Sequence, residues 1–341
     1  MKYDFTTIIN RQGKDAMAVD APGKFPSFPL PEDGFDFIPM WVADMNFATA
    51  PTVQSSIAER LTHPLYGYFI TRDEYYQSII NWHETRHQVT GLRKECIGYE
   101  NGVLGGLLSA LNAFASPGDS VLVHSPTYIG FTGSIGGAGY KIVHSELKRD
   151  EEGIWRMDYK DMDEKIKKHK IHVAVFCNPH NPTGRVWTLE ELEKAMKVYQ
   201  DNDCVVISDE IWSDIILNGN HHIPLQSISE DARKRTIALY APSKTFNLAG
   251  LIGSYHIIFD SYLRDRVRAC SSKSHYNSMN VLSMYALMGA YKPEGMEWVD
   301  ELCEVLSNNV NYAYNFINTH FEGISLSKPQ GTYMLFLDCT D

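Results

Sequence analysis

Short runs of apolar, often β-branched residues alternate with longer amphipathic stretches from about residue 95 onward. The runs predict strands buried on both faces of a sheet, over residues 120–124, 141–145, 172–176, 204–208, 236–240 and 254–259. The clearest helical pattern between them is LEELEKAMKVYQD, which follows Thr188 and has Glu191 at the third position of a capping box. Strands that alternate with helices predict the α/β class, with a mostly parallel sheet sandwiched by helices.

The pattern changes after about residue 260, where long helical stretches replace the alternation. Apolar residues recur at helical spacing from Met296 to Phe321, and the strand-like run TYMLFLDC comes last. We predict an N-terminal arm over residues 1–45, a large α/β domain over 46–285, and a connecting helix with the start of a smaller α+β domain over 286–341. Because the sequence stops at Asp341, beside that last run, we expect a shortened chain with an incomplete small domain.

Composition narrows the class of protein. With 44% hydrophobic and 21% charged residues, the chain has the composition of a soluble globular protein. Its net charge of -11 argues against nucleic-acid binding, which needs a basic surface. Neither a secretion signal nor an apolar run of about 18 residues is present, so we expect no membrane span and a cytoplasmic location. The six cysteines form no C-x-x-C pair, which argues against a disulfide framework or a zinc site, and we expect no metal site.

Polar segments follow four of the predicted strands, and a fifth opens a helix. They are SPTYIGF, CNPHNPTG, DEIWSD, APSKTF and NGVLGG. Because ligands bind beyond the carboxyl ends of parallel strands, we expect these segments to meet at one edge of the sheet. Each has a simpler interpretation on its own: a plain turn for NPHNPTG, a local cap for Asp209, a core edge for Tyr128 and a surface amine for Lys244.

Taken together, the segments match the chemical needs of pyridoxal 5'-phosphate (PLP). Its aldehyde forms a Schiff base with a lysine amine, here Lys244, and a carboxylate, here Asp209, pairs with its protonated ring nitrogen. Asn181 would donate a hydrogen bond to the phenolate oxygen of the ring, and Tyr128 would stack on the ring face. The set therefore predicts a PLP site.

The segment NGVLGG supplies a place for the cofactor phosphate. Backbone N–H groups of Val103 and Leu104, at a helix N-terminus, would bind the phosphate together with the hydroxyl of Ser243. The glycines of this segment stand at positions 102, 105 and 106, which is not the G-x-G-x-x-G spacing of a dinucleotide site. A nicotinamide-dependent dehydrogenase is therefore disfavoured.

The ordered motifs NGVLGG, SPTY, NPHNPTG, SDEIW and SKTFNLAG resemble those of the fold-type I PLP enzymes, the aminotransferase class I/II superfamily. The segments PMWVADMNFATAP (39–51) and HPLYGY (63–68) resemble more narrowly the MalY/PatB branch, the cystathionine β-lyase or C–S lyase subfamily. The resemblance extends over essentially the whole chain. It implies the PLP-transferase fold.

Residue roles follow from this resemblance at the matching positions. The family's Schiff-base lysine, ring-nitrogen aspartate, phenolate-binding asparagine and stacking aromatic fall on Lys244, Asp209, Asn181 and Tyr128. Tyr68 matches a tyrosine that reaches the phosphate of the neighbouring subunit, which implies a homodimer with shared sites. The substrate entrance would be lined by Trp41, Val42 and Ala43.

Some positions depart from the family pattern. Trp212 stands where many members have a tyrosine that bonds the phenolate oxygen, and its indole N–H would take over that contact. Ile252 stands where aminotransferases have a phosphate-binding arginine, which fits the lyase branch better. The family's arginine for the substrate carboxylate would lie beyond residue 341.

The resemblance implies α,β-elimination of L-cysteine S-conjugates to a thiol, pyruvate and ammonia, with the amine of Lys244 as the general base. An aminotransferase is the runner-up, because it uses the same residues up to removal of the α-proton. A third possibility is a regulatory or binding protein that keeps the fold with little turnover.

Overall fold

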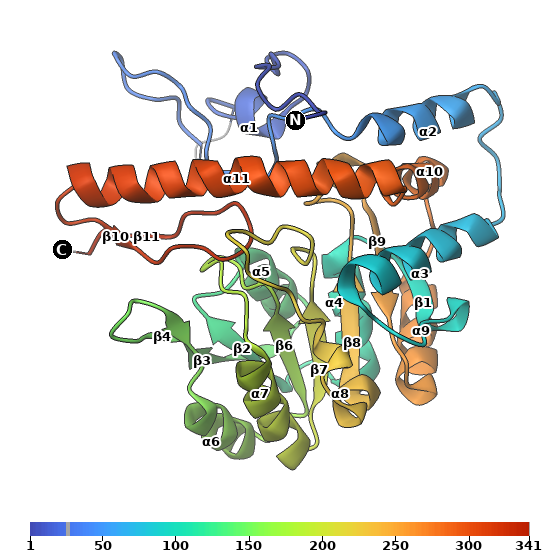
Figure 1. The fold of residues 1–341 in the computed structure, drawn as a ribbon. Helices are drawn as coiled ribbons and strands as arrows, with labels where there is room; N and C mark the ends of the chain where they lie inside the picture. The colour runs from blue at the N-terminus through green and yellow to red at the C-terminus, as the bar shows by residue number, and fades with distance from the viewer. Residues whose placement is uncertain (25–27, 341) are drawn as a thin grey trace.

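The computed structural model describes residues 1–24 and 28–340 (Figure 1). Its central sheet contains β1 (Ile97–Asn101), β2 (Ser120–Ser125), β3 (Lys141–Glu146), β6 (Val173–Cys177), β7 (Val205–Asp209), β8 (Thr236–Tyr240) and β9 (Gly253–Ile257). The strands lie in the order β1-β9-β8-β7-β6-β2-β3. Pairing is parallel from β8 through to β3, and β9 is antiparallel to both β8 and β1. The predicted α/β class with a mostly parallel sheet is confirmed.

Alternating side chains of the central strands pack into two separate cores. In β2, Val121 and Val123 contact one core and Leu122 contacts the other, as the period of two along a strand requires. One core is covered by α4 (Val103–Phe114), α5 (Ile129–Gly137) and α9 (Ser261–Ser274), and the other by α6 (Tyr159–His169), α7 (Leu189–Asp201) and α8 (Glu230–Arg235). The sheet is therefore sandwiched between helices.

Helix α7 begins at the predicted capping box. The Thr188 hydroxyl accepts a hydrogen bond from the Glu191 N–H at 3.3 Å, and the Glu191 carboxylate accepts one from the Thr188 N–H at 2.9 Å. The two bonds satisfy the N–H group of the residue before the helix and one N–H group of its first turn.

A third core includes residues of β1, β8 and β9 and of the segment around Lys244. It is formed with α2 (Pro51–Leu61), α3 (Asp73–His87), α10 (Val281–Ala290) and α11 (Pro293–His320). Helix α11 crosses above the sheet (Figure 1). Its Trp298 ring stacks on Phe246 with ring centroids 5.5 Å apart, so the long helix predicted from Met296 onward rests on the segment that carries Lys244.

Three strand predictions need correction. Strand β1 was not predicted, because Glu100 interrupts its apolar pattern. Strand β3 lies at the sheet edge with most of its residues partly exposed, so it is not buried on both faces. In the run TYMLFLDC only β11 (Leu337–Asp338) is a strand, and it pairs with β10 (Ser325–Leu326).

The remaining elements are short. They are α1 (Met17–Asp20), the hairpin of β4 (Lys148–Arg149) and β5 (Trp155–Arg156), and the 3₁₀ turns η1 (Lys94–Cys96), η2 (Leu225–Ser227) and η3 (Ala249–Leu251). All six cysteines are free thiols. Across residues 1–24 and 28–340, no helix has both the length and the apolar character needed to cross a membrane. The domain boundaries proposed after residues 45 and 285 stay a prediction.

Candidate active site

The polar segments that follow β2, β6, β7 and β8 lie at one edge of the sheet, because these four strands are parallel. The N-terminus of α4 lies at the same edge, since β1 and β8 are both antiparallel to β9 and therefore run in the same direction. This edge faces α11 (Figure 1). The five segments are thus brought together, as their order along the chain predicts.

Lys244 lies at the centre of this edge. Its Nζ donates a hydrogen bond to the Ala43 carbonyl oxygen at 2.9 Å and lies 5.6 Å from the centre of the Trp212 ring. Burial lowers the pKa of the Lys244 amine, and the nearby carboxylates of Asp209 and Asp44 oppose that shift. A lysine with a lowered pKa has a larger neutral, nucleophilic fraction at pH 7 than a surface lysine.

The segment that begins at Ala43 and the segment that follows Lys244 are tied together. The Asn247 side chain accepts a hydrogen bond from the Met45 N–H at 3.1 Å and donates one to the Met45 carbonyl oxygen at 2.9 Å. These bonds, with the one from Lys244 to Ala43, fix residues 43–45 against the lysine segment.

Asp209 is the last residue of β7 and its side chain is buried. One carboxylate oxygen accepts a hydrogen bond from the Ile211 N–H at 3.0 Å. Burial raises the pKa of Asp209 to about 7, while the charge of Lys244 lowers it in part. A buried carboxyl group with this environment is suited to a cationic N–H partner, which would stabilise its ionised form. The protonated ring nitrogen of PLP is such a partner, so the site fits the group.

Tyr128 and Asn181 lie beside this pair. The half-buried Tyr128 precedes α5 and packs edge-on against Phe131, with ring centroids 5.4 Å apart. Burial raises the pKa of Tyr128, and the charge of Asp209 adds to that shift. Asn181 is partly exposed at the same edge, and its side-chain amide has no hydrogen bond to any described residue. It is therefore available to a ligand.

The N-terminus of α4 is built to receive an anion. Gly102 precedes the helix with a φ of 75°, a conformation that favours glycine, and its N–H donates to the Ile252 carbonyl oxygen at 3.1 Å. The first helical hydrogen bond joins the Gly106 N–H to the Gly102 carbonyl, so the N–H groups of Val103 and Leu104 lie ahead of it. Ser243, next to Lys244, is partly buried.

Three other predicted residues lie further from this centre. The indole N–H of Trp41 donates to the Ala18 carbonyl oxygen at 3.1 Å, and its ring stacks on Phe28. Val42 is partly exposed beside it. Tyr68 is fully exposed to solvent.

Trp212 is buried beneath Lys244 and packs edge-on against Tyr333, with ring centroids 4.7 Å apart. No described residue accepts a hydrogen bond from its indole nitrogen. Its proposed contact with a phenolate oxygen stays a prediction.

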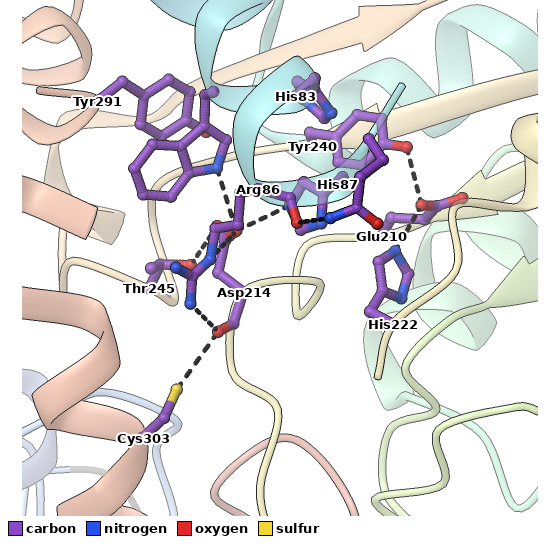
Figure 2. Close-up of polar contacts among 12 residues, drawn as sticks. His83, Arg86, His87, Glu210, Asp214, His222, Tyr240, Thr245, Tyr291 and Cys303 are labelled. Carbon is purple, nitrogen blue, oxygen red and sulfur yellow. Dashed lines mark hydrogen bonds and ion pairs between the residues drawn. The ribbon is translucent and has the colours of Figure 1, made fainter. Parts of the chain in front are cut away.

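A buried network behind the lysine was not predicted from the sequence. Figure 2 shows Asp214 at its centre, where its carboxylate accepts hydrogen bonds from Trp82 at 3.1 Å and Thr245 at 3.0 Å. His87 lies 2.9 Å and Arg86 3.3 Å from the same carboxylate. Although burial by itself raises the pKa of Asp214, the contacts with His87 and Arg86 outweigh it and hold that pKa well below its usual range. The network joins α3 to the residue after Lys244.

A second buried carboxylate belongs to Glu210, the residue next to Asp209. Glu210 lies 2.8 Å from the Ser208 hydroxyl, 3.0 Å from His222 Nε2 and 2.8 Å from the Tyr240 hydroxyl. Lys244 and Asp209 therefore each have a chain neighbour, Thr245 and Glu210, held in a buried polar network (Figure 2). The only sequence signal of these networks is that Glu210 and Asp214 are two further acids in the segment DEIWSD.

Replacing Asp214 by alanine is expected to lower the free energy of unfolding by about 3–5 kcal/mol, because Arg86 and three hydrogen-bond donors lose a buried partner. Urea denaturation measures the change. Asp300→Ala is the matched control, since Asp300 also contacts Arg86, at 2.9 Å, but its side chain is 69% exposed. The control should lose less than about 1 kcal/mol. Equal losses in the two variants would contradict the importance of the buried network.

Most of the chain matches a known protein family. The family model described as aminotransferase class I and II matches residues 45–341. The chain belongs to this family.

Two curated members and one solved structure of this family are similar to the chain over nearly all its length. Cystathionine beta-lyase PatB of Bacillus subtilis is 34% identical over 89% of this chain and 78% of the relative, and Protein MalY of Escherichia coli is 30% identical over 98% and 84%. Cystalysin of Treponema denticola, whose crystal structure contains a pyridoxal 5'-phosphate cofactor, is 31% identical with a TM-score of 0.92 over 99% of this chain and 84% of that chain. The resemblance to the MalY/PatB branch and the PLP-transferase fold are confirmed.

Proposed function

We propose that this chain is a PLP-dependent carbon–sulfur β-lyase that converts L-cysteine S-conjugates to a thiol, pyruvate and ammonia. The observation that carries the proposal is that a partly buried lysine amine and a buried carboxyl group lie at the same carboxyl edge of the sheet. The similarity to PatB and cystalysin supports the lyase reaction over others of the family.

PLP, when bound, supplies an aldehyde that bonds an amine and a ring that accepts electrons from the substrate α-carbon. Asp209 would keep a proton on the ring nitrogen, and Asn181 would donate a hydrogen bond to the phenolate oxygen. Tyr128 would cover the ring face. The N–H groups of Val103 and Leu104 would hold the phosphate together with the Ser243 hydroxyl.

Lys244 performs the proton transfer. With PLP bound, its amine would act as the general base that removes the α-proton of the substrate. The Ala43 carbonyl, 2.9 Å from Nζ, is the hydrogen-bond acceptor for the resulting ammonium group. Asp209 would stabilise the protonated ring nitrogen, which lets the ring accept charge from the α-carbon. Trp41 and Val42 lie at the substrate entrance beside Ala43.

We also propose a cytoplasmic homodimer that shares its active sites. Large apolar side chains are exposed in two segments near the edge, including Met40, Leu65, Tyr68 and Ile70. A cavity of about 700 Å³ lies next to the α4 N-terminus, between Phe69, Asn101 and Ile252. Exposed apolar surface of this kind favours association, and Tyr68 would reach the phosphate of the partner. A solution mass equal to that of one 38.7 kDa chain would contradict the dimer.

The lyase proposal predicts continued release of pyruvate from cystathionine when no keto acid is present. An aminotransferase is the second candidate, because the family description names that reaction. It would convert cystathionine to its own keto acid with the C–S bond intact and stop after one turnover per site, since its amino group then has no acceptor. A coupled lactate dehydrogenase assay measures the pyruvate. No pyruvate, with at most one equivalent of keto acid per site, would favour the aminotransferase, and PLP binding with no turnover of any thioether would favour a binding protein.

A further inference from the structure

The Ala43 carbonyl oxygen accepts two hydrogen bonds in the candidate active site. One comes from Lys244 Nζ at 2.9 Å, and the other from the Tyr333 hydroxyl at 3.0 Å. A carbonyl oxygen has two lone pairs, so both of its acceptor positions are used. Tyr333 was not among the residues predicted from the sequence, and it lies 89 positions after Lys244.

The segment that carries Tyr333 is fixed to the loops on both sides of the site. The N–H groups of Gln330 and Gly331 donate to the Gly184 carbonyl oxygen at 2.8 and 3.0 Å, and the Thr332 N–H donates to the Ile215 carbonyl oxygen at 2.9 Å. Gly184 follows Asn181, and Ile215 follows Asp209. The segment is thus held between the two loops that carry these residues.

The segment that carries Tyr333 packs closely against the loop that contains Gly184. A Cβ atom at Gly184 would lie 2.5 Å from Pro329, and one at Gly331 would lie 2.9 Å from Val186. The Tyr333 ring also packs edge-on against Trp212, whose ring lies beneath Lys244 Nζ. The hydroxyl of Tyr333 therefore has a fixed position relative to the lysine amine.

We propose that Tyr333 is a positioning residue for Lys244. Its hydroxyl holds the Ala43 carbonyl in place, and this carbonyl accepts the lysine amine whenever the amine is not covalently bonded. The carbonyl sets the place from which the amine takes and returns its proton. This role deepens the proposed lyase function and rests on it.

Removing the hydroxyl leaves the carbonyl held by fewer contacts. The ammonium form of Lys244 depends on that acceptor more than the neutral amine does, because hydrogen bonds from a charged donor are stronger. A less well held carbonyl therefore disfavours the ammonium form, and misplacement of the amine slows proton transfer.

The test compares Tyr333→Phe with wild type in the full chain, both with and without PLP. The pH dependence of Lys244 acetylation by acetic anhydride, followed by peptide mass spectrometry, reports the titration of the amine without the cofactor. Steady-state pyruvate release from cystathionine reports catalysis. Tyr140→Phe is the matched control, since it also removes one hydroxyl hydrogen bond, of 2.7 Å to Asn112, far from Lys244.

In Tyr333→Phe we expect the acetylation midpoint to fall by about half a pH unit and kcat to fall about tenfold, with KM changed less than about twofold. Tyr140→Phe should match wild type in the acetylation midpoint, in kcat and in KM. An unchanged or raised midpoint in Tyr333→Phe overturns the proposal. If the midpoint falls but wild type releases no pyruvate, the positioning role is supported and the lyase function is the part that fails.

Discussion

Replacing Lys244 by alanine is expected to lower kcat for pyruvate release by about 10⁴-fold or more, since the change removes both the amine that bonds the cofactor and the general base. The assay is steady-state pyruvate release at saturating PLP. No other lysine is assigned to the edge where the polar segments meet, so no substitute amine is expected from the described residues.

Lys273→Ala is the control for this prediction, because Lys273 is exposed on α9 and takes no part in the site. It should keep wild-type activity. Activity within a factor of about ten of wild type in Lys244→Ala would show that the lysine is not the base.

Replacing Asp209 by asparagine is expected to lower kcat on the order of 10²–10³-fold, because a neutral amide does not hold a proton on the ring nitrogen. The same pyruvate assay measures the loss. Asp203→Asn is the matched control, since Asp203 is exposed just ahead of β7 and has a φ of 50° that asparagine tolerates. Wild-type activity in Asp209→Asn would show that the reaction does not need the Asp209 carboxylate.

Asp209→Asn lowers activity, but it is expected to raise the stability of the protein without PLP. The pKa of Asp209 is raised from 3.8 to about 7 by burial. A raised carboxyl pKa favours the folded state below pH 4, and this stabilisation is lost as pH rises to 7 and above. Asp209→Asn has no charge to bury, so it should melt at a higher temperature than wild type at pH 8, with the gap closing towards pH 4. A lower melting temperature at pH 8 would contradict the burial argument.

Local pattern was enough to predict most of the sheet and the centre of the site. Strands β2, β6, β7 and β8 have short β-branched runs, and each ends in a polar segment whose place follows from parallel pairing. Lys244 and Asp209 were predicted because the chemistry of PLP needs both groups together. The capping box at Thr188 depends on residues three positions apart, so the sequence alone was sufficient for it.

The missed features depend on contacts between distant segments. Glu100 is polar, yet it is buried in β1 because Ser109, Ser271 and His256 bind its carboxylate, the last from 156 positions away. Asp214 meets His87 across 127 positions, and Tyr333 meets Ala43 across 290. Periodicity reports only which neighbours share a face, so it does not reveal such partners.

The central claim is that the Lys244 amine is the group that bonds the cofactor. Borohydride reduction of the PLP-loaded protein, followed by peptide mass spectrometry, tests it most directly. The account predicts one phosphopyridoxyl group per chain, attached to Lys244 and missing in Lys244→Ala. An adduct on another lysine, or the same adduct yield in Lys244→Ala, would contradict it.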